Sequence, residues 1–215
     1  MSRTVKRKRE LPLFGILLVV IMYISVVFLI SCSDIKYSSS NATKKYKTRT
    51  GKTITISETH PVGQSLSTIK ISTQDFEHNY QEIYEDRDLI SNVFLTDLDG
   101  NGFDEIYIFT ISAGSGIFGT ILGFASNKDK SLSMIYFLEI QKKAKNFEGY
   151  MGHDAFKLEK QKLIRIFPIC NEGDTNQNPT GGKRKLVYGL YPGEAMCQLR
   201  VEKSETLDSH KKEIE

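Results

Sequence analysis

Short runs of strand-forming residues, separated by turn residues, constrain the fold of this chain more than any other feature of its sequence. Residues 53–57 and 67–72 alternate polar and apolar side chains with a period of two, as strands with one buried face do. Further apolar runs of strand length lie at 92–96, 105–111, 120–125, 133–140, 155–160, 163–169, 185–191 and 196–202. No window offers three turns of amphipathic helix. The sequence therefore predicts an all-β domain, either an antiparallel sandwich or a barrel-like sheet.

The composition of the chain changes on both sides of this predicted domain, which we place at residues 53–203. Residues 1–31 begin with a short basic segment and continue into the uncharged apolar residues 11–30, a pattern typical of a secretory signal. Residues 32–52 are polar and rich in Ser, Thr and Lys, which favours a flexible tether. Residues 204–215 are charged, and we expect a frayed tail there.

The apolar segment ends in Leu29-Ile30-Ser31-Cys32, which resembles the lipobox of bacterial lipoproteins. The resemblance implies that Cys32 carries a diacylglycerol on its sulfur and becomes the N-terminus after cleavage. Because Ser33, and not Asp, follows the cysteine, the same resemblance implies sorting to the outer membrane, with the domain facing the periplasm or the cell surface. The alternative is an uncleaved membrane anchor, since 20 apolar residues are long enough to span a bilayer.

The net charge of +3 does not indicate a nucleic-acid partner. Removal of residues 1–31 takes away five positive charges and one negative charge, which leaves a mature chain of −1. A near-neutral domain lacks the basic surface that binds phosphate backbones. The expected partners are therefore a protein and, through the lipid, a membrane.

Residues 97–105 (DLDGNGFDE) have the spacing of a loop that binds a hard cation. Side-chain oxygens occupy the first, third, fifth and ninth positions, and glycine at the sixth allows the sharp turn. The expected ligands are the side chains of Asp97, Asp99, Asn101 and Glu105 and the carbonyl of Phe103. Because strand-like runs flank it, the segment resembles the calcium loops of β-repeat proteins such as integrin propeller blades. The alternative is a hairpin turn without an ion, in which these side chains cap their own backbone. Any calcium here would be structural.

Residues 112–119 (SAGSGIFG) form a second distinctive segment, between two strong strand runs. Three glycines and two serines are compatible with a long hairpin connection. A phosphate-binding loop is disfavoured, because no Lys-Ser or Lys-Thr pair and no helix follow.

Taken together, residues 90–125 resemble the periplasmic inhibitors of invertebrate-type (I-type) lysozyme. These are β-sandwich proteins of Gram-negative bacteria that insert a Ser-Gly-Ser-Tyr-like loop into the active-site cleft of the enzyme. The resemblance implies an inhibitory loop comprising Ser112, Gly114, Ser115, Gly116 and Phe118. Ser115 and Gly116 would stand at its inserting tip. Ile117 stands where that pattern has a small polar residue, and Phe118 lacks the tyrosine hydroxyl. Residues 149–156 and 174–182 also look like segments of larger bacterial proteins of this group.

The remaining candidates for chemistry are few. His153 and Asp154 are adjacent, but no serine or cysteine can be nominated as their nucleophile, and a turn hydrogen bond is the favoured role of His153. Cys170 and Cys197 are expected either to form a disulfide or to remain free thiols. We therefore expect a lysozyme-inhibiting lipoprotein, not an enzyme, with no cofactor beyond the calcium. The rival hypothesis is a calcium-stabilised envelope protein that binds carbohydrate or acts as a hydrolase.

Overall fold

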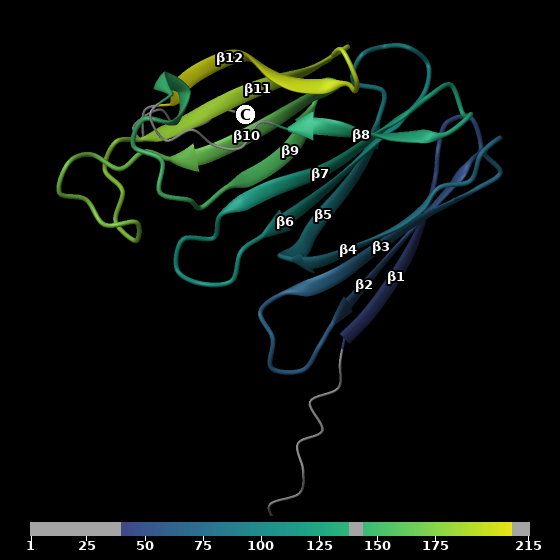
Figure 1. Ribbon diagram of the computed structural model, residues 1–215. Helices are drawn as coiled ribbons and strands as arrows, with labels where there is room; N and C mark the ends of the chain where they lie inside the picture. The colour runs from purple at the N-terminus through teal and green to yellow at the C-terminus, as the bar shows by residue number, and fades with distance from the viewer. Residues whose placement is uncertain (1–39, 138–143, 208–215) are drawn as a thin grey trace, which may run out of the picture. The chain divides into compact units, whose positions relative to one another are not determined.

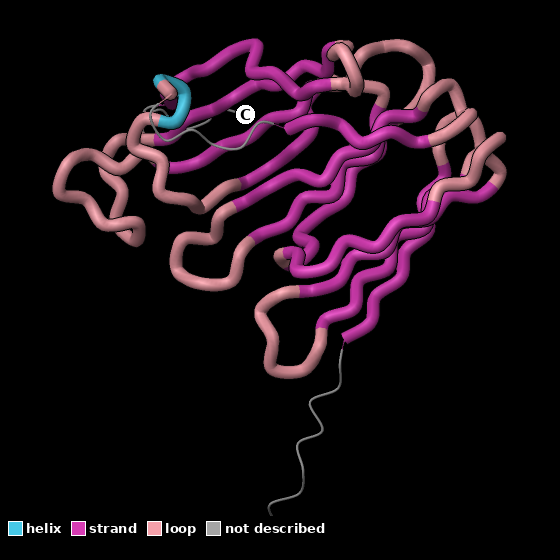
Figure 2. The backbone as a smooth tube through the Cα atoms, in the orientation of Figure 1, coloured by secondary structure: helices cyan, strands magenta, loops and turns pink. Residues whose placement is uncertain are grey.

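The computed structural model describes residues 40–137 and 144–207, and almost all of its regular structure is β-strand (Figures 1 and 2). The strands are β1 (Ser40–Lys47), β2 (Thr53–His60), β3 (Ser67–Gln74), β4 (Gln81–Arg87), β5 (Leu89–Thr96), β6 (Glu105–Ile111), β7 (Gly119–Ser126), β8 (Leu132–Phe137), β9 (Ala155–Glu159), β10 (Lys162–Pro168), β11 (Lys183–Tyr191) and β12 (Gln198–Leu207). A short 3-10 helix, η1 (Lys145–Phe147), precedes β9. The all-β prediction is confirmed. Cys32 and the rest of the predicted signal lie outside the described residues, and no helix in the described part could span a membrane.

The strands form two sheets. The first has four antiparallel strands in the order β1-β2-β3-β4. The second has eight, in the order β5-β6-β7-β8-β12-β11-β10-β9. Its two antiparallel halves, β5–β8 and β9–β12, meet at a short parallel pairing of Gln198 and Leu199 in β12 with Tyr136 and Phe137 in β8.

Two hydrophobic cores hold these layers together. The first core lies between the two sheets and comprises Ile54, Ile56, Ile69, Ile71, Phe76, Ile106, Ile108, Phe124 and Leu132. The second core lies between the two halves of the large sheet and comprises Leu98, Tyr107, Phe109, Ile121, Ala125, Ile135, Tyr150, Leu163, Phe167, Leu186, Tyr188, Leu190 and Leu199. Each fully buried isoleucine contributes roughly 1.5–3 kcal/mol to stability. Strand β3 shows the predicted period of two, with Ile69 and Ile71 buried.

Strand β6 supplies both cores at once, which explains the four consecutive apolar residues from Ile106 to Phe109. Ile106 and Ile108 face the first core, whereas Tyr107 and Phe109 face the second. A strand buried on both faces needs apolar residues at every position. In Figure 1, strands β5–β7 accordingly lie between the β1–β4 sheet and strands β9–β12. The loops at the two ends of β6 are those that the sequence singles out.

Two domain boundaries predicted from composition are wrong. Residues 40–47, assigned to the flexible tether, form β1 and pair with β2 along its whole length. Tyr46 packs against the first core, while lysines occupy this edge strand, where charge discourages pairing with other chains. Residues 204–207, assigned to the tail, belong to β12, and residues 208–215 lie outside the described part. An edge strand needs little apolar surface because backbone hydrogen bonds hold it, so composition did not show it.

Candidate functional site

The loop between β5 and β6, residues 97–104, is closed by its own acidic and amide side chains. The Asp97 carboxylate accepts hydrogen bonds from the main-chain N–H groups of Asn101 and Gly102, both at 2.9 Å. The Asn101 side chain accepts one from the Phe103 N–H at 2.8 Å and donates one to Asp99 at 2.9 Å. Glycine at position 102 is required by the backbone, whose φ is +89° there. The local sequence thus dictates this turn.

Arg49 docks onto this loop from the turn between β1 and β2. Its guanidinium donates to Asp97 at 2.9 Å and to Asp104 at 2.8 Å, and its main-chain N–H donates to Asp104 at 2.6 Å. Both carboxylates are buried. Arg49 lies in the segment that composition assigned to the tether, and it joins the small sheet to the large one. Arg49 is separated from Asp97 by 48 positions and from Asp104 by 55, so no local sequence pattern could have predicted either contact.

Three of the five expected calcium ligands are carboxylates, and the structure brings all three together. Oxygens of Asp97, Asp99 and Glu105 lie within 4.8 Å of one another. Glu105 is fully buried; one of its oxygens accepts the Leu98 N–H at 2.7 Å, and the other has no hydrogen-bond partner. Burial, with smaller effects from Asp99 and Asp97, raises the pKa of Glu105 to about 8. This oxygen-rich donor set fits a hard divalent cation such as calcium.

The loop between β6 and β7, residues 112–118, lies at the opposite end of β6 (Figure 1). A seven-residue strand spans roughly 20 Å, so an ion in the first loop cannot touch the second. Ser112 closes the base of the loop: its N–H donates to the Phe118 carbonyl at 2.8 Å, and its hydroxyl accepts the Phe118 N–H at 2.9 Å. Ser112 is therefore a residue of the base, not of the tip.

The turn at residues 149–154 braces the loop from one side. The His153 N–H donates to the Gly116 carbonyl at 2.7 Å, and the Asp154 N–H donates to the Ile117 carbonyl at 3.4 Å. Gly152 sits so close that an added Cβ would overlap the Gly116 carbonyl oxygen. Gly116 is consequently buried, and the expectation that it stands at the inserting tip is wrong. The His153 bond comes from its main chain, and its imidazole Nε2 is buried without a hydrogen-bond partner, so the turn role favoured for this side chain stays a prediction.

A buried ion pair lies beneath this brace. Asp154 and Arg165 side chains are both completely buried, with 2.6 Å between the Asp154 carboxylate and Arg165 Nε. The other Asp154 oxygen accepts the Tyr150 hydroxyl at 2.5 Å and the Gly119 N–H at 2.7 Å. Arg165 Nη2 also donates to the Gly119 carbonyl at 3.2 Å. Asp154 therefore orients the end of the loop, and it does not orient a histidine.

Aromatic rings surround the buried guanidinium and extend to the loop. The Arg165 guanidinium carbon lies 5.2–5.5 Å from the ring centroids of Phe147, Tyr150 and Phe156, within cation–π range. The Phe118 ring contacts Tyr150 edge-on at 5.8 Å between centroids. The sequence signal that could have found Arg165 is its alternation with Leu163 and Phe167, which places a charge on a core-facing side of β10.

A third segment, residues 171–180, touches the tip of the loop. Asn176 Nδ2 donates to the Ser115 carbonyl at 3.3 Å. Asp174 holds this segment closed by accepting main-chain bonds from Thr180 at 2.8 Å and Asn171 at 2.7 Å, and these bonds lower its pKa. The two segments that the family resemblance grouped with the loop, 149–156 and 174–182, therefore both contact it.

The outer surface of the loop is uncharged and mostly apolar. Ser115 is exposed, Ile117 is 38% exposed and Phe118 is 42% exposed, and Met151 of the neighbouring turn is 41% exposed. Residues 112–119 and 149–152 contain no charged side chain. Contact confined to these two segments would therefore desolvate no charged side chain of theirs.

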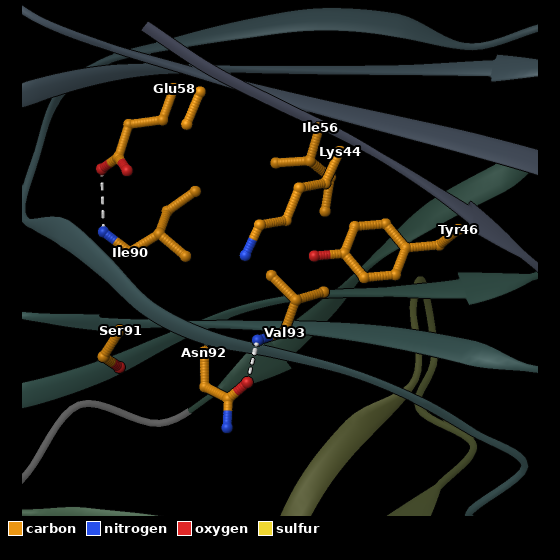
Figure 3. A pocket seen from close by; sticks show the side chains of 9 residues that line it. Lys44, Tyr46, Ile56, Glu58, Ile90, Ser91, Asn92 and Val93 are labelled. Atoms are coloured by element: carbon orange, nitrogen blue, oxygen red, sulfur yellow. Dashed lines mark hydrogen bonds between the residues drawn. The ribbon is translucent and has the colours of Figure 1, made fainter. Parts of the chain in front are cut away.

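A cavity of about 120 Å³ lies between the edge strands β1 and β5 (Figure 3). Glu58 lines it and accepts the Ile90 N–H at 2.8 Å, and Asn92 caps the Val93 N–H at 2.8 Å. These side chains satisfy donors along the edge of β5. The cavity has room for several water molecules.

Cys170 and Cys197 are free thiols, so the disulfide alternative is wrong and the free-thiol alternative is confirmed. The Cys170 thiol donates to the Thr175 carbonyl at 3.8 Å, whereas Cys197 packs at the margin of the second core.

Comparisons of the chain with protein-family models, with curated proteins and with solved structures found no match.

Proposed function

We propose that this protein binds and inhibits a lysozyme-type hydrolase by inserting the tip of loop 112–119 into the active-site cleft. The observation that carries the proposal is that the loop is held by contacts from two other segments while its tip stays exposed. A preformed loop loses little conformational entropy on binding, which favours tight inhibition. Inhibition by occupancy requires no catalytic group.

The proposal places the protein in the cell envelope as an outer-membrane lipoprotein with its lipid on Cys32. Seven residues would then separate the acylated cysteine from the start of β1. Seven extended residues reach at most roughly 25 Å, so the domain would stay close to the membrane surface. An inhibitor at this position would intercept a hydrolase before it reached the cell wall.

The inhibition assay uses the purified full-length protein in detergent, with I-type, chicken-type and goose-type lysozymes acting on cell walls. Wild-type protein should inhibit at least one class at micromolar excess. Ser115→Tyr should abolish inhibition, because added bulk on an exposed tip residue cannot enter a cleft. Ser133→Tyr is the matched control, since Ser133 is also exposed but lies on β8.

Phe118→Tyr tests the role of the missing hydroxyl. It should strengthen inhibition of an I-type enzyme if a phenol donor reaches a catalytic carboxylate. Full activity of all three lysozymes with folded wild-type protein would contradict the proposed function.

We also propose that loop 97–105 binds calcium in a structural role. The specific observation in its favour is the buried, unpartnered oxygen of Glu105 beside Asp97 and Asp99. Arg49 pairs with Asp97 and Asp104, whereas Asp99 and Glu105 have no ion-pair partner among the described residues and would be neutralised by calcium. This hypothesis concerns stability and is compatible with lysozyme inhibition.

A further inference from the structure

Ile117 has an unusual backbone conformation at the exposed tip of the loop. Its φ is +45°, in the left-handed region. The other non-glycine residues with positive φ in the described part of the chain are Asp75, Asp86, Lys128, Asp129, His153, Lys160 and Gln161. None of these has a β-branched side chain. A β-branched residue is the least favoured type in this region, because its side chain crowds the neighbouring carbonyl.

The surroundings of Ile117 enforce this conformation. On its N-terminal side, the Gly116 carbonyl is fixed by the His153 N–H at 2.7 Å. On its C-terminal side, Phe118 is tied to Ser112 through both its N–H and its carbonyl. The Ile117 carbonyl itself faces the Asp154 N–H. Strain that persists at one residue must be compensated by the contacts around it, and such residues concentrate at binding sites.

The strained residue belongs to an exposed apolar surface made by two segments distant in sequence. Ile117 and Phe118 come from the loop, and Met151 comes from the bracing turn. A soluble protein that gained nothing from this isoleucine would be more stable with glycine or asparagine at position 117. The combination of strain, exposure and absence of charge indicates that the side chain has a partner.

We infer that Ile117 is the anchor that determines which hydrolase is bound, by filling an uncharged apolar pocket within the partner's substrate cleft. This inference rests on the proposed function and deepens it. The selected partner is one whose cleft offers an apolar subsite beside the catalytic groups.

The test compares Ile117→Gly and Ile117→Asn with wild-type protein, using melting temperature and the inhibition constant against the lysozyme that wild type inhibits best. Both substituents tolerate positive φ, so Tm should rise by roughly 2–4 °C. Loss of one buried aliphatic side chain from the interface should weaken inhibition roughly ten- to a hundredfold. Lys128→Gly is the matched control, because it relieves positive φ at an exposed turn between β7 and β8 and should leave inhibition unchanged.

Each outcome decides a different point. Unchanged inhibition by both Ile117 variants would overturn the anchor role while leaving the proposed function intact. A lower or unchanged Tm in both would overturn the inference that position 117 is strained. If folded wild-type protein inhibits none of the lysozymes, the proposed function and the anchor role fail together.

Discussion

Replacing Asp154 by alanine should destabilise the protein strongly, because it leaves the buried Arg165 guanidinium without its counter-ion. Both side chains are 0% exposed, so water can neither screen the pair nor replace the lost carboxylate. Breaking such a pair costs about 3–5 kcal/mol. For a domain of this size, about 2–4 °C of Tm corresponds to 1 kcal/mol, which gives a fall of roughly 6–20 °C. Asp154 also accepts bonds from Tyr150 and Gly119, which favours the upper part of this range.

Urea unfolding followed by circular dichroism measures this loss, since the chain contains no tryptophan. The double variant Asp154→Leu/Arg165→Met removes both charges and fills the space with apolar atoms. Its loss of unfolding free energy should therefore be smaller than the sum of the losses in Asp154→Leu and Arg165→Met. Glu202→Ala, which breaks the partly exposed pair with Lys162, is the control and should cost no more than about 1 kcal/mol. A loss below 1 kcal/mol for Asp154→Ala, or simple additivity in the double variant, would refute the reasoning.

Four further predictions concern the turn at residues 149–154, the metal loop and the lipid. Gly152→Ala should weaken inhibition at least tenfold, because its Cβ would displace the Gly116 carbonyl. Gly173→Ala is the control and should leave inhibition unchanged, because Gly173 also has positive φ but has open space around it. Calcium at ten times a Kd of about 10⁻⁴–10⁻³ M should add roughly 1.4 kcal/mol of stability, and a melting curve unaffected by calcium or chelator would exclude the site. In chelator, Glu105 keeps a proton up to about pH 8 that the unfolded chain releases near pH 4.5, so the unfolding free energy should fall by about 3 kcal/mol from pH 5 to pH 8. Glu105→Gln should remove that slope, and persistence of the slope would show that another group causes it. Cys32→Ala should prevent labelling with fatty acid, and a labelled variant would disprove the lipoprotein hypothesis.

The sequence by itself determined the elements whose physics is local. The period-two alternation of residues 67–72 and the largely apolar run of residues 105–111 predicted β3 and β6, because side-chain burial follows directly from strand geometry. The turn at residues 97–104 was equally predictable, since Asp97 and Asn101 bond to main-chain groups only a few positions away. The exposed position of Ser115 also agrees with the sequence prediction.

Only the tertiary structure decided what depends on contacts between distant segments. Strand β1 was missed because an edge strand is held by backbone hydrogen bonds, which leave no apolar pattern. The pairing of Arg49 with Asp104 and of Asn176 with Ser115 joins residues 55 and 61 positions apart. The burial of Gly116 follows from the neighbouring turn. A sequence specifies side-chain chemistry and local backbone preference. The packing of one segment against another decides which residues at the tip of loop 112–119 stay exposed for contact with a partner.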